Sequence, residues 1–227
     1  MMDRRFDEEL NELNNKLLKM ATLTQESIYL AVESIKNRDK DLAEKIMNSD
    51  KRIDEFELDI DDFSIELLAR RQPLAGDLRF ITTGMKINGE LERIADLSVN
   101  IAERSLDLSA QPLLKPLIDI PVFSELAVNM VKDTIDAFVE RDAELAEKVI
   151  KMDVEANRLR DLIQGELVED YMAKDISTLS RGLSLFLVAQ HLERICDHAK
   201  YISEAVIYLV SARVVKHSSL KKQTDNL

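Results

Sequence analysis

The sequence predicts an all-α protein built from two tandem antiparallel three-helix bundles, and three observations carry this prediction. Among 227 residues there are only 5 Gly and 4 Pro, too few for the many turns of a β-sandwich or β-barrel. Hydrophobic residues make up 45% of the chain and recur at the three- and four-residue spacing of amphipathic helices. The helical pattern of the first half also returns in the second half, as an internal duplication predicts.

Three long helices are predicted in the first half of the chain. Apolar residues follow a helical period from Phe6 to Ile35, and Asp39 is a suitable N-cap for a second helix. Gln72 and the proline after it end that helix, and a third helix runs to about Leu108. Beyond it lies the only obvious linker, which holds three prolines: Pro112, Pro116 and Pro121.

The second half repeats this plan. Its helices are expected at about 122 to 140, 142 to 172 and 177 to 212, giving six long helices in all. The predicted division is a first three-helix unit, a linker, a second three-helix unit and a flexible tail: 1–108, 109–121, 122–216 and 217–227. Short connections place sequential helices side by side, so each unit is expected to be an antiparallel bundle.

Two aligned segment pairs reveal the duplication. RDKDLAEKIMNSD (38–50) matches RDAELAEKVIKMD (141–153) at an offset of 103 residues. LERIADLSVNI (91–101) matches LERICDHAKYI (192–202) at an offset of 101 residues. Because the two offsets are nearly equal, one duplicated three-helix unit explains both likenesses.

Composition and motifs exclude several classes of function. The formal net charge of −12 opposes nonspecific nucleic-acid binding, because a polyanion meets a repulsive field. No P-loop, nucleophile elbow or dinucleotide-binding glycine motif occurs, so no catalytic site is visible and no organic cofactor is expected. A non-catalytic protein is therefore predicted.

Cysteine usage and hydropathy indicate the compartment. Cys196 is the only cysteine, and it is interpreted as a small core residue rather than a nucleophile. The charged N-terminus lacks the apolar stretch of a signal peptide, and the most apolar tract, 183–189, is too short to span a bilayer. A cytoplasmic protein is expected, one that reaches a membrane only through partners.

Paired carboxylates recur on the third helix of each unit. A helical wheel places Glu92 and Asp96 in the first unit, and Glu193 and Asp197 in the second, on the outer face away from the apolar arc. Such a pair often belongs to a merely solvated face. Acids four residues apart repel one another, however, and a metal ion would remove that repulsion.

The second helix of each unit offers further oxygen ligands. Asp50 and Asp54 are four residues apart in the first unit, and Asp153 and Asn157 take their places in the second. Carboxylate and amide oxygens accept hard or borderline cations. The first unit is therefore predicted to bind a metal ion more tightly than the second.

The histidines argue against a buried di-iron enzyme. Such bundles carry a Glu-x-x-His step, and none of the three histidines has Glu three residues before it. His191 and His198 fall on the side of their helix away from the paired acids and are interpreted as boundary or surface residues. His217 lies at the start of the predicted tail.

Three segments together resemble the PhoU family of phosphate-signalling regulators. They are QPLAGDLR (72–79), MKINGELERIADLSVNIAERS (85–105) and HLERICDHAKYISEAVIYLV (191–210), and the likeness extends over roughly 6–212. The resemblance implies a cytoplasmic regulator that represses the phosphate regulon. It also implies partners, namely the ATPase subunit of the phosphate ABC transporter (PstB) and the sensor histidine kinase (PhoR), and homodimers in several members.

The resemblance further implies metal sites on E(D)-x-x-x-D motifs. Iron or zinc is expected most, and magnesium or manganese is possible. The matching positions in this chain, with the flanking asparagine and the second-helix oxygens, are Glu92, Asp96, Asn100, Asp50 and Asp54 in the first unit and Glu193, Asp197, Asp153 and Asn157 in the second. Tyr201 replaces the second asparagine, and this departure leaves the second site weaker.

Two functions from different classes remain at this point. The first is a non-catalytic adaptor that links the transporter ATPase to the sensor kinase. The alternative is a metal-carboxylate enzyme or a metal-storage bundle that uses the outward acids. Turnover of phosphoesters or oxygen by metal-loaded protein would favour the alternative.

Overall fold

The computed structural model describes residues 4–213, and within this range the chain forms six α-helices and no strand. The first unit contains α1 (Arg4–Asn37), α2 (Lys40–Arg71) and α3 (Ala75–Ser109), and the second contains α4 (Asp119–Glu140), α5 (Ala143–Glu166) and α6 (Leu179–Ser211). The all-α prediction with six long helices is confirmed. The predicted tail and His217 lie outside the described residues.

The same turn joins the first two helices of each unit. Arg38 and Arg141 adopt left-handed backbone conformations with φ of 57° and 54° and end α1 and α4. The aspartate that follows each one caps the next helix, since Asp39 accepts the backbone N–H of the third residue after it. Asp142 accepts those of the second and third. The predicted N-cap at Asp39 is confirmed.

The second unit differs from the predicted boundaries at two places. α4 begins at Asp119, so Pro121 lies in its first turn, where a missing N–H costs no intrahelical hydrogen bond. After α5 the chain continues as a π-helical turn, Leu167–Met172, and a short 3-10 helix, Ile176–Thr178, precedes α6. The helix predicted for 142 to 172 is thus an α-helix followed by a π-helical turn.

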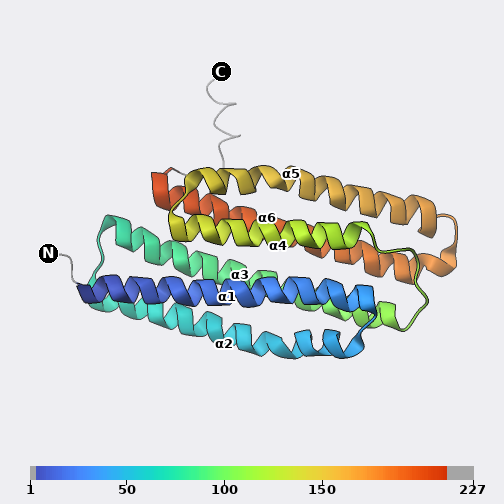
Figure 1. Ribbon diagram of the computed structural model, residues 1–227, viewed down its shortest axis with the longest axis horizontal. Helices are drawn as coiled ribbons and strands as arrows, with labels where there is room; N and C mark the ends of the chain where they lie inside the picture. The colour runs from blue at the N-terminus through green and yellow to red at the C-terminus, as the bar shows by residue number, and fades with distance from the viewer. Residues whose placement is uncertain (1–3, 214–227) are drawn as a thin grey trace, which may run out of the picture.

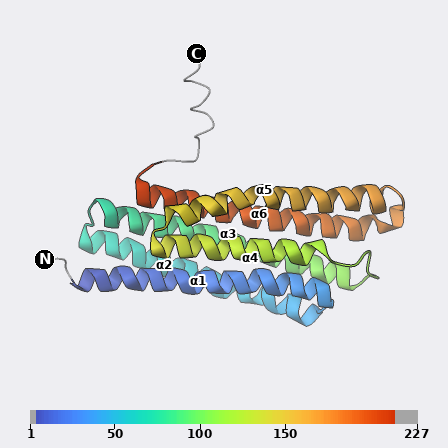
Figure 2. The ribbon, with the colours of Figure 1, turned by 45° about the horizontal axis from the view of Figure 1, so that its top comes forward.

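The two units lie side by side and share one core. α3 packs along α6, and α1 packs along α4, as Figures 1 and 2 show from two directions. Buried side chains from all six helices form one continuous hydrophobic cluster. Phe80 of α3 stacks on Phe138 of α4 with ring centroids 5.1 Å apart, so aromatic packing crosses from one unit to the other.

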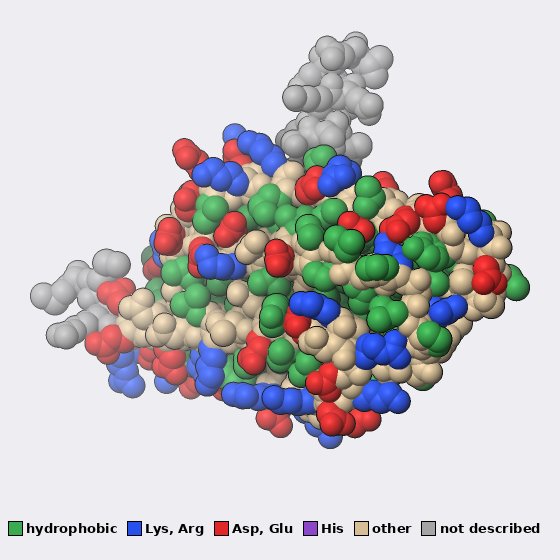
Figure 3. Space-filling view, turned by 45° about the vertical axis from the view of Figure 1, so that its right-hand side comes forward, with side chains coloured by type: hydrophobic (Ala, Val, Ile, Leu, Met, Phe, Trp, Pro, Cys, Tyr) green, Lys and Arg blue, Asp and Glu red, His purple; other side chains and the backbone are tan. Residues whose placement is uncertain are grey.

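Exposed hydrophobic side chains occur at the end of the molecule where the α3–α4 connection lies. Leu113, Ile118 and Ile176 are 57%, 67% and 78% exposed. The face in Figure 3 shows hydrophobic side chains interspersed with acidic and basic ones. Among the helices of residues 4–213, none combines the length and apolarity that a membrane span requires.

Candidate functional site

The outer faces of α2 and α3 carry an acidic cluster in the first unit. Each helix contributes carboxylates at three- or four-residue steps, which places them on one face. The first acidic cluster consists of Asp50, Asp54, Glu57 and Asp61 on α2 and Glu92 and Asp96 on α3.

Burial and mutual repulsion dominate the electrostatics of the first acidic cluster. Burial raises the pKa of Asp50, and the carboxylates of Asp54 and Asp96 raise it further. Burial likewise raises the pKa of Glu92; Asp96, Glu57 and Asp54 add to this effect, and Arg93 opposes it. Carboxylates of α2 and α3 thus act on one another, which shows that the acids predicted on the two helices lie close together.

No cation neutralises this cluster by direct pairing. The ion pairs of α2 involve other acids, such as Asp59 with Lys16 and Glu66 with Arg70. Within residues 4–213, none of the six clustered carboxylates forms an ion pair. The first acidic cluster therefore holds several uncompensated negative charges.

Two asparagines extend the acidic face of α3. Asn100 follows Asp96 by one turn and is half-buried. Asn88, one turn before Glu92, is fully buried and donates its amide to the Glu57 carbonyl at 2.8 Å and to Asp61 Oδ1 at 3.0 Å. Its Oδ1 has no hydrogen-bond partner among the described residues. Asn88 was not among the ligands predicted from the sequence, although its four-residue step before Glu92 was a usable signal.

The second unit repeats the acidic positions but adds cations. Arg160 of α5 lies with Nη1 2.5 Å from Glu193 Oε1, and Lys200 of α6 lies with Nζ 2.7 Å from Asp153 Oδ2. Glu193 is only 8% exposed, so its predicted place on the outer face is wrong. The Arg160 guanidinium supplies the ion pair that a buried carboxylate requires.

Asp153, Glu193 and Asp197 make up the second acidic cluster, and the pKa shifts of Glu193 and Asp197 reflect these cations. Burial raises the pKa of Glu193, and Asp197 raises it further, while Arg160 opposes both effects. Burial and Asp153 raise the pKa of Asp197, while Lys200 lowers it. The two cations thus oppose the repulsion in the second cluster, although the pKa values of Glu193 and Asp197 remain raised.

The remaining predicted ligands of the second unit are differently placed. Asn157 donates its amide to the Asp153 carbonyl of its own helix at 2.9 Å, and Tyr201 is exposed. At the offsets of the repeat, Arg160 takes the position of Glu57 and Lys200 that of Val99. The sequence analysis missed both cations, although the same alignment contains them.

The oxygen-rich chemistry of the first cluster fits a hard or borderline cation better than that of the second. The first cluster offers carboxylates that form no ion pair among the described residues. The second is already occupied by Arg160 and Lys200. As placed in residues 4–213, no three acidic, histidine or cysteine side chains are arranged to hold one metal ion, so ligation requires side-chain rotation.

The histidines and the cysteine of α6 lie deeper than the acids. His198 is buried, and its Nδ1 lies 2.5 Å from Glu90 Oε2 of α3, so its interpretation as a boundary or surface residue is wrong. Packing of α6 against α3 encloses it. Burial lowers the pKa of half-buried His191. Cys196 is fully buried, and burial raises the pKa of its thiol, which confirms its interpretation as a small core residue.

The fold and the two clusters define a class of protein: a six-helix bundle of two repeated units, each with an acidic face on its second and third helices. The PhoU domain model matches this chain twice, at residues 17–105 and 120–206, one match in each unit. The double match confirms the duplication. The chain belongs to the PhoU family.

Similar proteins span nearly the full length. A phosphate-specific transport system accessory protein PhoU homolog from Aquifex aeolicus is 40% identical over 217 residues, which cover 96% of this chain and 98% of that protein. One from Pseudomonas putida is 37% identical, with coverage of 98% and 87%. The crystal structure of PhoU from Pseudomonas aeruginosa has a TM-score of 0.87 at 34% identity and covers 92% of this chain and 100% of that one.

Proposed function

We propose that this protein is a non-catalytic accessory regulator of a phosphate-specific transport system. The observation that carries this proposal is the 40% identity, over nearly the whole chain, to a protein named for that role. In this role the protein links the ATPase subunit of the phosphate transporter to the sensor histidine kinase and keeps phosphate-starvation genes repressed. It acts in the cytoplasm and reaches the membrane only through these partners.

Deletion of the gene tests the regulatory role. A strain that lacks it is expected to express phosphate-starvation genes in high phosphate, and a plasmid copy is expected to restore repression. A transcriptional reporter measures both results. Unchanged reporter expression in the deletion strain would contradict the proposal.

Charge is the basis of the proposed partner recognition. The chain carries a formal net charge of −12, and basic surfaces on a transporter ATPase or kinase complement it. Affinity for either partner is expected to fall as ionic strength rises, because salt screens exposed charges. Binding that is indifferent to salt would contradict an electrostatic contribution.

We further propose a metal site at the first acidic cluster, with iron or zinc as the first candidates and magnesium or manganese as others. The ligands would be Asp50, Asp54, Glu92, Asp96 and Asn100. Uncompensated carboxylates on two helices support this proposal, since a bound cation removes their repulsion. Asp153, Asn157, Glu193 and Asp197 form a weaker counterpart, because Arg160 and Lys200 compete with a metal ion there.

A homodimer is the proposed oligomeric state. Long amphipathic bundles commonly associate, and isologous dimers are the commonest symmetric assembly. Light scattering is expected to return twice the 25.9 kDa monomer mass. The monomer mass across a wide concentration range would contradict this proposal.

A further inference from the structure

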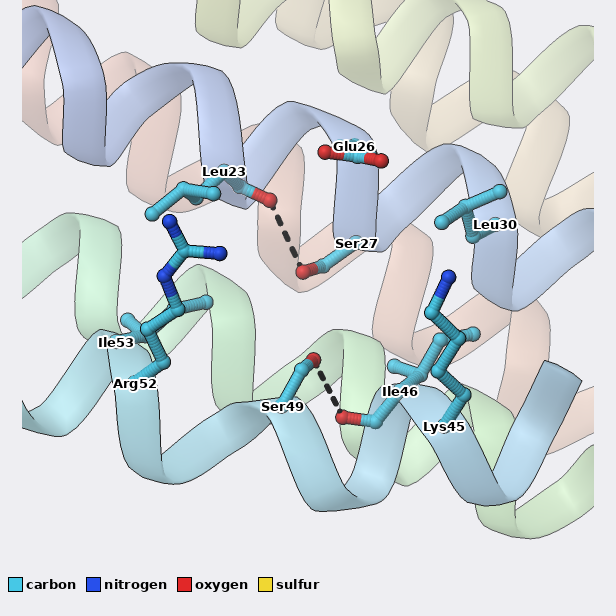
Figure 4. Close-up of a pocket in the computed structure, with 9 residues that line it drawn as sticks. All are labelled: Leu23, Glu26, Ser27, Leu30, Lys45, Ile46, Ser49, Arg52 and Ile53. Carbon is cyan, nitrogen blue, oxygen red and sulfur yellow. Dashed lines mark hydrogen bonds between the residues drawn. The ribbon is translucent and has the colours of Figure 1, made fainter.

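A recess opens between α1 and α2 of the first unit, on the side of α2 that faces α1 (Figure 4). Its volume is about 190 Å³. Four apolar side chains form its walls: Leu23 and Leu30 of α1, and Ile46 and Ile53 of α2. Each pair is seven residues apart, so the recess extends along two helical turns, about 10.5 Å at 1.5 Å per residue.

Two serines create the recess. Ser27 and Ser49 lie between the apolar pairs, where a larger side chain would fill the space between the helices. Ser27 donates its hydroxyl to the Leu23 carbonyl at 3.0 Å, and Ser49 donates to the Ile46 carbonyl at 2.8 Å. Both hydroxyl hydrogens are therefore used within their own helices. Neither serine needs a ligand to accept a hydrogen bond from it.

The second unit carries larger side chains at the two positions that are serine in the first unit. At the offset of 103 residues, Ser27 corresponds to Met130 and Ser49 to Met152. Met130 is fully buried, and Met152 packs against the core. The repeat thus accommodates large apolar side chains at both positions, where the first unit has serines. An apolar side chain that entered the recess would cover the parts of its four apolar wall residues that water reaches.

Two cations line the rim of the recess. Lys45 and Arg52 are also seven residues apart on α2, and Figure 4 shows their side chains extending along the recess toward α1. Within residues 4–213, neither forms an ion pair. In the second unit the position of Arg52 is taken by Glu155, which pairs with Arg158 at 2.7 Å. Glu26 of α1 also lies at the rim.

We propose that this recess docks an acidic helix of a partner protein, which inserts one large apolar side chain between Ser27 and Ser49. Two carboxylates of that helix, three or four residues on either side of the apolar anchor, are seven residues apart and match the spacing of Lys45 and Arg52. The apolar anchor of the partner helix would enter the recess as a knob enters a hole, with that helix packed along α1 and α2. The proposal rests on the proposed function, since the partner is one of the phosphate-signalling proteins.

The decisive variant fills the recess as the second unit does. Ser27→Met with Ser49→Met is expected to raise Tm by about 2–4 °C, because it replaces empty space with apolar contacts. The same variant is expected to weaken binding to a partner at least about tenfold. The probes are the purified transporter ATPase subunit and the cytoplasmic part of the sensor kinase, each titrated against the full chain.

A second variant keeps the test valid if the methionines disturb folding. Lys45→Gln with Arg52→Gln removes the rim charges at the surface and is expected to weaken binding about tenfold. The matched control is Lys148→Gln, the equivalent of Lys45 in the second unit, and it should bind as the parent does. If the parent binds and all three variants bind equally well, the inference is wrong.

The two proposals fail in different ways. A deletion strain that shows no derepression contradicts the proposed function, whatever the recess does. A deletion strain that is fully complemented by the filled variant, together with unchanged affinity for both probes, contradicts the recess alone. Absence of binding by the parent to either probe overturns the proposed partners and the docking site together.

Discussion

The two acidic clusters occupy equivalent places on equivalent helices, yet only the second contains cations that pair with its carboxylates among the described residues. In the first unit, burial and repulsion raise the pKa values of Asp50, Glu92 and Asp96, and no described cation pairs with them. In the second, Arg160 and Lys200 pair with Glu193 and Asp153. A duplicated backbone therefore fixes where charges lie, while single substitutions decide whether a cluster is open to an external cation.

The largest expected effect comes from breaking the internal pairing of the second unit. Arg160→Ala leaves Glu193 buried without its cation and should lower the free energy of unfolding by about 2–4 kcal/mol. Denaturant unfolding measures this loss. The control is Arg158→Ala, which removes an exposed pair with Glu155 and should leave the same free energy nearly unchanged. Equal losses would show that burial of Glu193 does not depend on pairing.

Metal binding should separate the two clusters next. Asp96→Ala is expected to lower metal affinity at least about tenfold and to remove most metal-dependent stabilisation, because the open cluster loses a central carboxylate. Asp197→Ala should have a smaller effect, since the cations already satisfy its neighbours. Metal stoichiometry and Tm, with and without Fe or Zn, provide the measurement.

Exchanging one residue sharpens this comparison. Glu57→Arg gives the first cluster the cation that Arg160 supplies in the second, and it should reduce metal binding without altering the helices. A larger loss at Asp197 than at Asp96 would reverse the predicted ranking of the two sites. Absence of metal from the parent and from every variant would indicate that both clusters are acidic surfaces in contact with water and bind no metal ion.

The N-caps should respond alike, because both units retain them. Asp39→Ala and Asp142→Ala are each expected to lower the free energy of unfolding by about 1 kcal/mol. The second loss should be somewhat larger, since Asp142 accepts two backbone N–H groups and Asp39 accepts one. Thermal unfolding of the two variants checks the order. A loss confined to one unit would indicate that the turns are not energetically equivalent.

The smallest expected effect is a pH dependence of the metal-free first cluster. The raised pKa values of Asp50 and Asp96 mean that the folded state takes up protons at higher pH than the unfolded state does. The stability they contribute is complete below the ordinary carboxyl pKa and is lost as pH rises through the raised values. Asp50→Asn with Asp96→Asn should therefore raise Tm by about 1–2 °C at neutral pH, and this gain should shrink toward pH 4.

A residue with the opposite shift provides the control for this pH series. Hydrogen bonds from Ser177 lower the pKa of Asp175, so its charged form is favoured in the folded state. Its contribution is present above the ordinary carboxyl pKa and is lost as pH falls through the lowered value. Asp175→Asn should thus lower Tm at neutral pH. A gain in Tm that persists unchanged at low pH for the cluster variant would refute the repulsion argument.

Helical periodicity predicted the helices well because the apolar spacing and capping residues that define a helix lie within its own stretch of sequence. Apolar spacing, the Asp39 cap and the proline after Gln72 identified the first three helices, and the repeat supplied the others. α4 began earlier than predicted because Pro121 was interpreted as part of the linker, whereas a first turn accepts it.

The depth of individual side chains was harder to predict. A helical wheel gives the angle of a residue around its own axis, but the neighbouring helix decides whether that angle faces solvent. Glu193 and His198 were misplaced for this reason, since Arg160 of α5 and Glu90 of α3 cover them. The recess at Ser27 and Ser49 is likewise invisible to periodicity, because small residues at core-facing positions keep the same pattern.

The core that the two units share has a consequence for how the molecule comes apart. Packing of α3 on α6 and the stacking of Phe80 on Phe138 bury apolar surface of each unit against the other. Melting one half would expose the inner surface of the other, so the chain should unfold in a single concerted transition. Duplication has here produced one cooperative body, and a ligand bound to either half would protect the amide hydrogens of both from exchange.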